Sequence, residues 1–195
     1  MEALMSSITA RTYLTPEEYL TFERKALTKH EYLSGEIVAM SGASFAHNFI
    51  TGDIFGELRA QLRGGKCKAA TSDMRVKVSE TGSYFYPDVV VFCGEPQAED
   101  NRSDTLLNPT VIVEVLSPST EARDRGEKFW HYQQLASLRE YVLVSQDRVC
   151  VEHRFREGTD WLRTEFREFE DVMLLASIEC ELCLRDIYSS VDISH

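Results

Sequence analysis

Two short apolar runs in this sequence each hold one acidic residue, and these runs constrain the fold more than any other feature. The run PDVVVF places Asp88 directly before three valines, and the run TVIVEVL places Glu114 among valine, isoleucine and leucine. Their β-branched residues predict two strands, and the second has so few polar positions that we expect burial on both faces. Burying a carboxylate is costly unless another group compensates its charge. The sequence therefore predicts a compensating group close to both acids.

The rest of the chain predicts alternating helices and strands. Thr15 is a plausible N-cap with Pro16 at the first helical position, and a second helix from Phe45 ends at Gly64 and Gly65. A hairpin with its turn at Ser34-Gly35 lies between these helices. The further expected segments are strands at 67–71, 74–78, 84–92, 110–116, 139–145, 148–155 and 160–169, a loop at 94–109, and helices at 121–136 and 184–188.

This order of elements predicts an α/β or α+β fold with a mixed central sheet flanked by helices. The 195 residues suffice for one well-cored domain, and we find no repeat or long linker that would divide them. No apolar stretch approaches the length of a membrane-spanning helix. The N-terminal residues lack the basic-then-apolar pattern of an export signal, so we expect a cytoplasmic protein that does not enter a membrane.

The five cysteines do not predict a disulfide framework. Cys67, Cys93 and Cys150 lie in apolar, strand-like surroundings, where a free cysteine behaves as a small buried hydrophobe. Cys180 and Cys183 form a CxxC pair without a second pair, which favours core packing over a zinc site. This usage suits a reducing cytosol.

The formal net charge of −11 counts against strong non-specific binding of nucleic acid. The basic residues are unevenly spread, however, and gather in two regions. Such clusters indicate either a local positive face or the solvated side of a helix and a strand edge. The two groups are Arg59, Arg63, Lys66, Lys68, Arg75 and Lys77, and then Arg123, Arg125 and Lys128.

If the strands of Asp88 and Glu114 are neighbours, both carboxylates can point into one cleft. Mg²⁺ takes one or two protein carboxylates and completes its shell with water and phosphate oxygens, so it would supply the missing compensation. A glycosidase also uses two carboxylates, but we find no aromatic cleft for a sugar between them. Asp124, Lys128 and Tyr132 follow at spacings of four and share a helix face. The Asp124–Lys128 pair alone is equally typical of a surface ion pair.

These residues resemble the acidic core of the PD-(D/E)XK nuclease superfamily. More narrowly, the chain is similar to the Uma-two family of putative restriction endonucleases, also known as a domain of unknown function. The similarity runs from about Leu14 to Val144, and its most specific part is the segment from the SPST motif to Lys128. The matching stretches are HEYLSGEIVAMSG, the helix that carries His47, SDMRVKV, YPDVVVF, VIVEVLSPSTEARDRGEKFWHY and REYVLV.

The resemblance implies a restriction-endonuclease-like core and hydrolysis of phosphodiester bonds with Mg²⁺, for which Mn²⁺ can substitute. In the superfamily the lysine stands two residues after the glutamate, whereas this chain has Leu116 there. The resemblance implies that Lys128 from the next helix replaces it, and that Asp88, Glu114 and Lys128 are the catalytic residues. The expected metal ligands are Asp88, Glu114, the backbone carbonyl of Val115, and Glu31.

His47, Asp73 and Tyr132 are the substrate-binding candidates. Each also has a structural interpretation: a hydrogen-bonded packing residue, a turn residue and a core aromatic. The expected partner is nucleic acid, with DNA as the substrate, and a homodimer would let two sites cut two strands. The alternative is a catalytically inactive protein of nuclease fold that binds nucleic acid or another protein. Leu116 and the acidic net charge favour that alternative.

Overall fold

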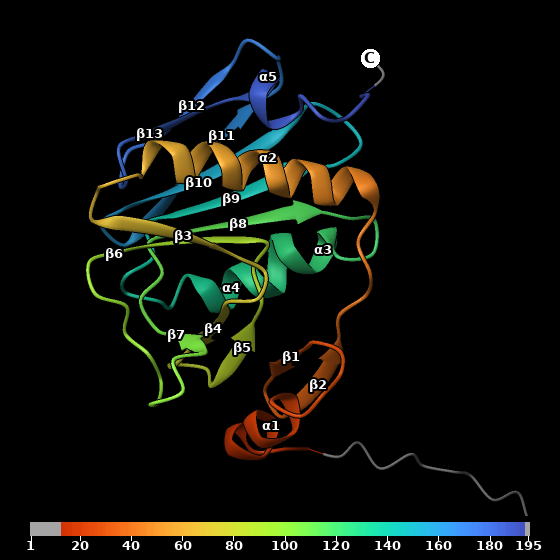
Figure 1. Ribbon diagram of the computed structural model, residues 1–195, viewed down its shortest axis with the longest axis vertical. Helices are drawn as coiled ribbons and strands as arrows, with labels where there is room; N and C mark the ends of the chain where they lie inside the picture. The colour runs from red at the N-terminus through yellow and green to blue at the C-terminus, as the bar shows by residue number, and fades with distance from the viewer. Residues whose placement is uncertain (1–12, 194–195) are drawn as a thin grey trace, which may run out of the picture.

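A six-stranded mixed sheet forms the centre of the protein, whose computed structural model describes residues 13–193 (Figure 1). Only β8 and β9 run parallel, and all other neighbours in this sheet are antiparallel. This architecture confirms the predicted α+β class with a mixed sheet. In sheet order the strands are β11 (Asp160–Phe166), β10 (Val151–Glu157), β9 (Glu140–Ser145), β8 (Val111–Leu116), β6 (Val89–Cys93) and β3 (Cys67–Thr71).

A second, five-stranded sheet lies next to the first and carries the predicted N-terminal hairpin. The hairpin turns at Ser34-Gly35, where both residues have positive φ angles. Its outer side is covered by helix α1 (Pro16–Glu23), which begins with the predicted capping box at Thr15. In sheet order the strands are β2 (Glu36–Ala39), β1 (His30–Leu33), β5 (Ser83–Phe85), β4 (Arg75–Val78) and β7 (Thr105–Leu106).

Helices cover both faces of the six-stranded sheet (Figure 1). On one face lies α2 (Phe45–Gln61), which buries Ile50, Ile54 and Leu58 and packs beside α5 (Leu184–Ile187). On the other face a continuous helical segment combines α3 (Glu121–Arg123), η1 (Asp124–Lys128) and α4 (Phe129–Tyr132).

Alternation along the central strands decides which helix each side chain meets. Val111, Val113 and Val115 of β8 belong to the core cluster under α2. Ile112 and Leu116 belong to the opposite cluster, which contains residues of α4. Successive side chains of a strand point to opposite faces, so Glu114 shares the face of Ile112 and Leu116. Burial of all six β8 residues confirms the prediction of a strand covered on both sides.

The structure differs from the expected elements in several places. The expected strand 84–92 is two strands, β5 and β6, because Pro87 cannot donate to a sheet and interrupts the run beside Asp88. The expected helix 121–136 ends at Tyr132, and its middle turn is a π-helix. The acidic C-terminal segment also forms an unpredicted hairpin of β12 (Val172–Leu175) and β13 (Cys180–Cys183).

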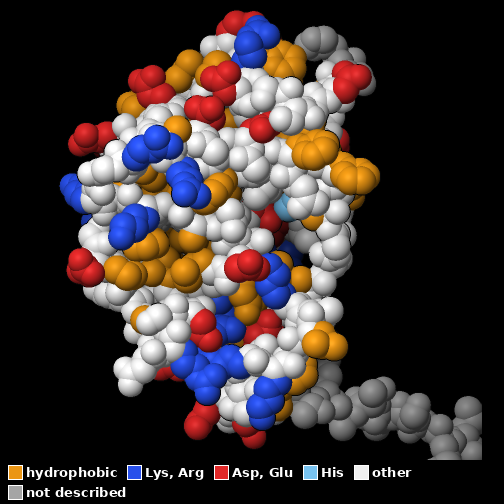
Figure 2. All heavy atoms as spheres, in the orientation of Figure 1, with side chains coloured by type: hydrophobic (Ala, Val, Ile, Leu, Met, Phe, Trp, Pro, Cys, Tyr) orange, Lys and Arg blue, Asp and Glu red, His pale blue; other side chains and the backbone are white. Residues whose placement is uncertain are grey.

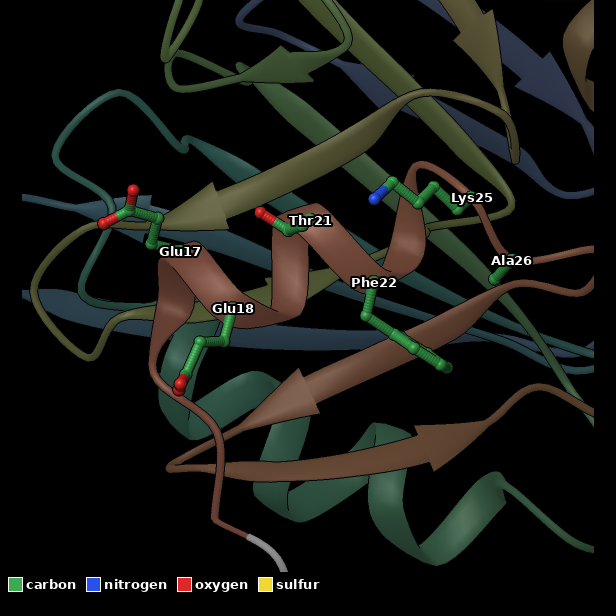
Figure 3. A pocket seen from close by; sticks show the side chains of 6 residues that line it. All are labelled: Glu17, Glu18, Thr21, Phe22, Lys25 and Ala26. Atoms are coloured by element: carbon green, nitrogen blue, oxygen red, sulfur yellow. The ribbon is translucent and has the colours of Figure 1, made fainter.

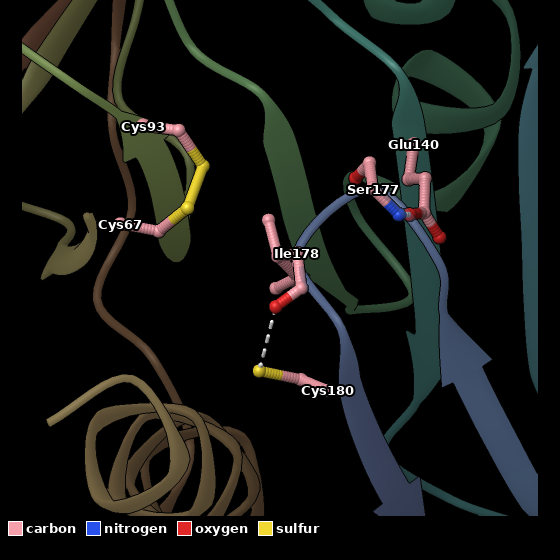
Figure 4. The surroundings of a disulfide bond; sticks show 6 residues. All are labelled: Cys67, Cys93, Glu140, Ser177, Ile178 and Cys180. Atoms are coloured by element: carbon pink, nitrogen blue, oxygen red, sulfur yellow. Dashed lines mark hydrogen bonds between the residues drawn. A yellow bond between two sulfur atoms is a disulfide. The ribbon is translucent and has the colours of Figure 1, made fainter. Parts of the chain in front are cut away.

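The prediction that Cys67 and Cys93 are free thiols was also wrong, because they form a disulfide (Figure 4). Local sequence shows only that both positions are apolar, whereas the β3–β6 register places them directly opposite each other. Cys150, Cys180 and Cys183 are free, and Cys180 packs in the core under α2. The prediction of core packing for the CxxC pair is thus confirmed for Cys180, whereas Cys183 is half-buried outside the core cluster.

Within residues 13–193, no helix has both the length and the apolar character needed to cross a membrane. Most of the N-terminal segment on which the prediction of no export signal rests lies outside the described residues.

Candidate active site

A cleft of about 920 Å³ opens at the carboxyl end of β8, between the start of α2, the β1–β2 hairpin and the start of the helical segment α3–η1. Figure 2 shows acidic and histidine side chains in a recess on the right of the molecule, with basic side chains below them. The cleft brings together most of the predicted site residues. Those that line it are Glu31, His47, Asp88, Glu114, Val115 and Lys128.

Asp88 and Glu114 face the cleft from adjacent strands. Val89 of β6 pairs with Val113 of β8, and Val90 pairs with Ile112, so the register continued by one residue sets Asp88 opposite Glu114. The backbone N–H of Val115 donates to Asp88 Oδ2 at 2.7 Å, which fixes the aspartate against β8. The two acids therefore lie on one face of the sheet, as the interpretation of a shared metal cleft required.

Glu114 is only 3% exposed and takes its contacts through one oxygen. Lys128 Nζ donates to Glu114 Oε1 at 3.2 Å, and the hydroxyl of Tyr132 donates to the same atom at 3.1 Å. Both donors come from the helical segment that packs on this face of β8. Both donors give the buried carboxylate of Glu114 hydrogen bonds that it would otherwise lack, because burial removes it from water.

Lys128 lies at the centre of an acidic cluster. Besides Glu114, its ammonium group contacts Glu31 Oε1 at 3.0 Å and Asp124 Oδ1 at 3.1 Å. Burial alone would lower the pKa of Lys128, but these three carboxylates outweigh burial and raise it. Lys128 is therefore charged at neutral pH. The Asp124–Lys128 pair is buried, so its interpretation as a surface ion pair was wrong.

The cleft holds more negative than positive charge. Four carboxylates line it, those of Glu31, Asp88, Glu114 and Asp124, against the three cations Lys29, Arg123 and Lys128. Arg123 Nη1 lies 2.9 Å from Glu31 Oε2. Burial is the main reason that the pKa of Glu114 is raised well above its usual range. Lys128 acts in the opposite direction, and the neighbouring carboxylates add to the rise. Burial and the neighbouring carboxylates thus disfavour the ionised form of Glu114.

His47 lies in the first turn of α2, where Ser44 caps the helix by accepting from the backbone N–H of His47. Its Nε2 lies 3.2 Å from Asp88 Oδ2. Burial would lower the pKa of His47, but the hydrogen bond and the charge of Asp88 raise it, with a further contribution from the Val115 backbone. His47 therefore contacts one oxygen of Asp88 from the start of α2.

The π-helical turn η1 positions Lys128 and Asp124. Such turns are rare and occur often at functional sites, because one extra residue per turn shifts the side chains that follow. Gly126 lies within it, and Tyr141 of β9 donates to the backbone carbonyl of Asp124 at 2.9 Å. This hydrogen bond ties the turn to the sheet.

Two predicted substrate contacts do not line the cleft. The carboxylate of Asp73 is 93% exposed on its turn and pairs with Lys29 at 2.9 Å. Tyr132 is fully buried between aromatic rings and reaches only Glu114 with its hydroxyl. A substrate-binding role for either residue stays a prediction. Leu116 is buried in the core beneath α4, so the usual position of the lysine is filled by packing.

Sequence reasoning missed Arg123 as a cleft residue and assigned no role to Asp124 there. The signal was present in the basic group that contains Arg123 and in the spacing of four between Asp124 and Lys128. The cleft also contains buried polar atoms without a hydrogen-bond partner within the described residues, which is typical of a site that binds a ligand. These atoms are His47 Nδ1, Thr51 Oγ1 and Arg123 Nη2.

The donor set fits Mg²⁺ better than a metal that needs a full protein shell. Over residues 13–193, no three His, Cys, Asp or Glu side chains gather closely enough to hold a metal by themselves. The described contacts of Asp88 and Glu114 fall on Oδ2 and Oε1, so Oδ1 and Oε2 remain for a ligand. Two carboxylates and an unsatisfied negative charge match the preference of Mg²⁺ for few protein ligands. By contrast, both oxygens of Glu31 already contact cations.

Another hollow, of about 540 Å³, lies along α1 and the turn that follows it. Its side chains fan out from a single helix rather than pointing toward one another (Figure 3). Convergent polar groups mark a binding site, and this hollow has none among its lining residues. We therefore assign the candidate site to the cleft at Asp88 and Glu114.

Comparison with a solved structure shows that the chain shares its fold with another protein. A protein from Anabaena variabilis, whose crystal structure is described as that of "a putative nuclease belonging to DUF820", superposes with a TM-score of 0.75. At 17% identity it covers 90% of this chain and 98% of its own, and it shows that the two share a fold.

The chain belongs to the Uma2 family, described as "Putative restriction endonuclease", whose profile matches residues 16–185. Two uncharacterized proteins of Synechocystis sp. are similar to it. The protein named sll1609 is 38% identical over 162 residues, which cover 83% of this chain and 92% of that protein. The protein named slr1290 is 39% identical over 178 residues, which cover 90% of this chain and 91% of that protein.

Proposed function

We propose that this protein is a metal-dependent endonuclease that hydrolyses phosphodiester bonds of nucleic acid, with DNA as its substrate. The observation that carries the proposal is the convergence of Asp88, Glu114 and Lys128 on one cleft from two strands and a helix. Membership of the Uma2 family supports the reaction class.

The proposed metal ligands are Asp88, Glu114 and the carbonyl of Val115, with Mg²⁺ as the resident ion and Mn²⁺ as a substitute. A divalent cation there would supply Lewis acidity to a phosphate oxygen and lower the pKa of a water molecule. The fixed position of Asp88 on the Val115 N–H and the excess negative charge of the cleft both favour cation binding. Whether Glu31 also acts as a ligand stays a prediction.

Lys128 is proposed to keep Glu114 ionised and to offset negative charge on the reacting phosphate. Its raised pKa keeps it charged across the physiological range. Because its three donors already contact three carboxylates, it must exchange one of them to reach a substrate. Arg123 also lines the cleft, and its Nη2 has no hydrogen-bond partner among the described residues. We propose that Arg123 contacts phosphate.

Local charge explains how a protein of net charge −11 would bind nucleic acid. The resident cation, Lys128 and Arg123 place positive charge only where phosphate must lie, so affinity should fall steeply with salt. We propose a homodimer as the active form, since two sites related by two-fold symmetry can cut both strands of a duplex.

A second candidate is a protein of nuclease fold that binds nucleic acid or another protein without cutting. Leu116 in place of the usual lysine and the full engagement of Lys128 by carboxylates favour it. In that case the cleft would no longer bind a metal, and its basic side chains would neutralise its acidic ones.

Cleavage assays on plasmid, linear and branched DNA with Mn²⁺ or Mg²⁺ separate the two candidates. The variants are Asp88→Asn and Lys128→Ala, and Asp160→Asn is the matched control because Asp160 is an exposed acid of β11 outside the cleft lining. We expect cleavage by the wild type and the control, and loss of at least ~100-fold in Asp88→Asn. Cleavage retained in Asp88→Asn would remove this residue from the reaction, and no cleavage by any form would favour the binding module.

A further inference from the structure

A second polar cavity lies at the opposite end of the central sheet from the cleft. It has a volume of about 520 Å³ and is formed where β8 and β9 begin, whereas the cleft is formed where they end. Segments far apart in sequence build it, including the turn between β12 and β13. Its lining residues are Lys66, Cys93, Thr110, Ser137, Arg139, Phe155, Arg156, Ala176 and Ser177.

The cavity is cationic, although the chain as a whole is acidic. Lys66, Arg139 and Arg156 line it, and no acidic residue does. Among the ion pairs of the described residues, none of these three cations has a carboxylate partner. Burial and the nearby charge of Arg139 lower the pKa of Arg156. Like charges held together without a counter-ion indicate that an anion completes the site.

Arg156 is held rigidly in this arrangement. Its guanidinium donates to the backbone carbonyls of Leu135 and Gln133 and stacks over the ring of Trp161, 4.7 Å from the centroid. A guanidinium that is fixed in place loses little freedom when it binds a ligand, which favours affinity. Arg139 makes no side-chain contact of this kind and is exposed, so it is free to close on an anion.

Two hydroxyl groups in the cavity have no hydrogen-bond partner. Ser137 Oγ and Ser177 Oγ are both buried and unpaired within the described residues. The backbone N–H of Ser177 donates to the buried carboxylate of Glu140 at 2.8 Å, which fixes the turn that presents the hydroxyl (Figure 4). Buried hydroxyl groups are normally satisfied, so these two point to a ligand that accepts hydrogen bonds.

We propose that this cavity binds a phosphate group attached to a planar ring, as in a nucleoside monophosphate. Lys66, Arg139 and Arg156 supply the charge, and the two serine hydroxyls donate to phosphate oxygens. The half-buried ring of Phe155 supplies a surface on which a base can stack. The volume lies within the range of small-molecule pockets, about 300–1,000 Å³.

The same phosphate chemistry is available from a free nucleotide or from the end of a nucleic-acid strand. The proposal concerns residues outside the cleft, so it does not depend on nuclease activity. Calorimetric titration of the full chain with four probes separates the sources: inorganic phosphate, adenosine 5′-monophosphate, adenosine, and a 5′-phosphorylated oligonucleotide. The catalytic variant Asp88→Asn is titrated in parallel, because it changes the cleft and leaves this cavity intact.

The test variants are Arg139→Gln and Ser177→Ala, which remove one charge and one hydroxyl. Lys68→Gln is the matched control, since Lys68 is an exposed cation that does not line the cavity and has no carboxylate partner among the described ion pairs. We expect adenosine 5′-monophosphate to bind more tightly than adenosine. We expect its Kd to rise by about 10-fold or more in Arg139→Gln, and less in Ser177→Ala.

Lys68→Gln and Asp88→Asn should bind adenosine 5′-monophosphate as tightly as the wild type does. Equal binding of adenosine 5′-monophosphate and adenosine, or an unchanged Kd in Arg139→Gln, would overturn the proposal. Binding of the oligonucleotide alone, lost in Arg139→Gln, would support a phosphate site and overturn the assignment to a free nucleotide. Circular dichroism of each variant confirms that a change in Kd does not reflect unfolding.

Discussion

Lys128 Nζ lies 3.2 Å from Glu114 Oε1, and both side chains are almost fully buried. The lysine comes from a π-helical turn and the glutamate from the middle of the central sheet, 14 residues apart in sequence. This pair compensates one buried carboxylate without any bound ion. It also leaves the cleft with more acids than bases, which is why we expect a cation to bind there.

Replacing Lys128 with Met should destabilise the protein, because three carboxylates would lose their shared counter-ion. Breaking a buried ion pair from one side typically costs about 3–5 kcal/mol, so we expect a loss of about 3 kcal/mol in the free energy of unfolding. Urea denaturation at pH 7 measures it. A loss below about 0.5 kcal/mol would show that the cluster is solvated rather than buried.

The substitution Tyr132→Phe should separate hydrogen bonding from packing. The ring remains between Phe85 and Tyr141, but the hydroxyl that donates to Glu114 is lost. We expect a cost of about 1 kcal/mol in the free energy of unfolding. If the hydroxyl holds Glu114 in place, cleavage should slow with little change in KM for DNA. A large rise in KM instead would place Tyr132 in contact with substrate.

The Cys67–Cys93 disulfide predicts a stability that depends on redox state. It closes a loop with a sequence separation of 26, for which chain entropy predicts a contribution of about 3 kcal/mol. Cys93→Ser should therefore lower the melting temperature of the oxidised protein. A reducing agent should likewise lower the melting temperature of the wild type, and it should leave that of the variant unchanged. Intact-mass measurement with and without reduction gives the state of the bond, and equal melting temperatures would contradict its role.

The contact between Arg24 and Asp104 should contribute to the free energy of unfolding at neutral pH, and this contribution should be lost in acid. Arg24, which holds Asp104 through two hydrogen bonds, is the main reason that the pKa of Asp104 falls from 3.8 to about 2. A carboxylate with a lowered pKa stabilises the folded state above its unfolded pKa of about 3.9, and this stabilisation is lost as the pH falls toward 2. Because Asp104 is 37% exposed, solvent screening reduces the expected contribution to about 1 kcal/mol.

The variant Asp104→Asn tests this contribution. Its cost in the free energy of unfolding should be about 1 kcal/mol at pH 7 and should shrink between pH 4 and pH 3, as measured by urea denaturation. The ion pair between Lys77 and Glu99 does not include Asp104, so the substitution leaves that pair intact. A cost that stays constant from pH 7 to pH 3 would contradict the assignment to the ionised carboxylate.

Much of the fold was predictable because its signals are local. The capping box at Thr15, the Ser34-Gly35 turn and the glycines after α2 act through neighbouring residues. The disulfide and the β12–β13 hairpin were not predictable from such signals. The disulfide depends on the register of β3 against β6, and the hairpin buries Met173, Leu175, Cys180 and Leu182 within an otherwise acidic segment.

The acids of the site were found because a carboxylate in an apolar strand is physically unusual. Lys128 was assigned through family resemblance, since its spacing from Asp124 fits an exposed ion pair equally well. Arg123 escaped notice for a similar reason: a charged residue in the first turn of a helix is normally solvated. Only the packing of this helix against β8 turns these side chains into the cleft.

Titration with Mn²⁺, followed by calorimetry, tests the central claim most directly. We expect the wild type and the control Asp160→Asn to bind one ion per chain. Asp88→Asn and Glu114→Gln should lose this binding while they keep their fold by circular dichroism. Wild-type protein that binds no ion, or variants that bind it as tightly as the wild type, would contradict the account of this cleft as a metal-dependent site.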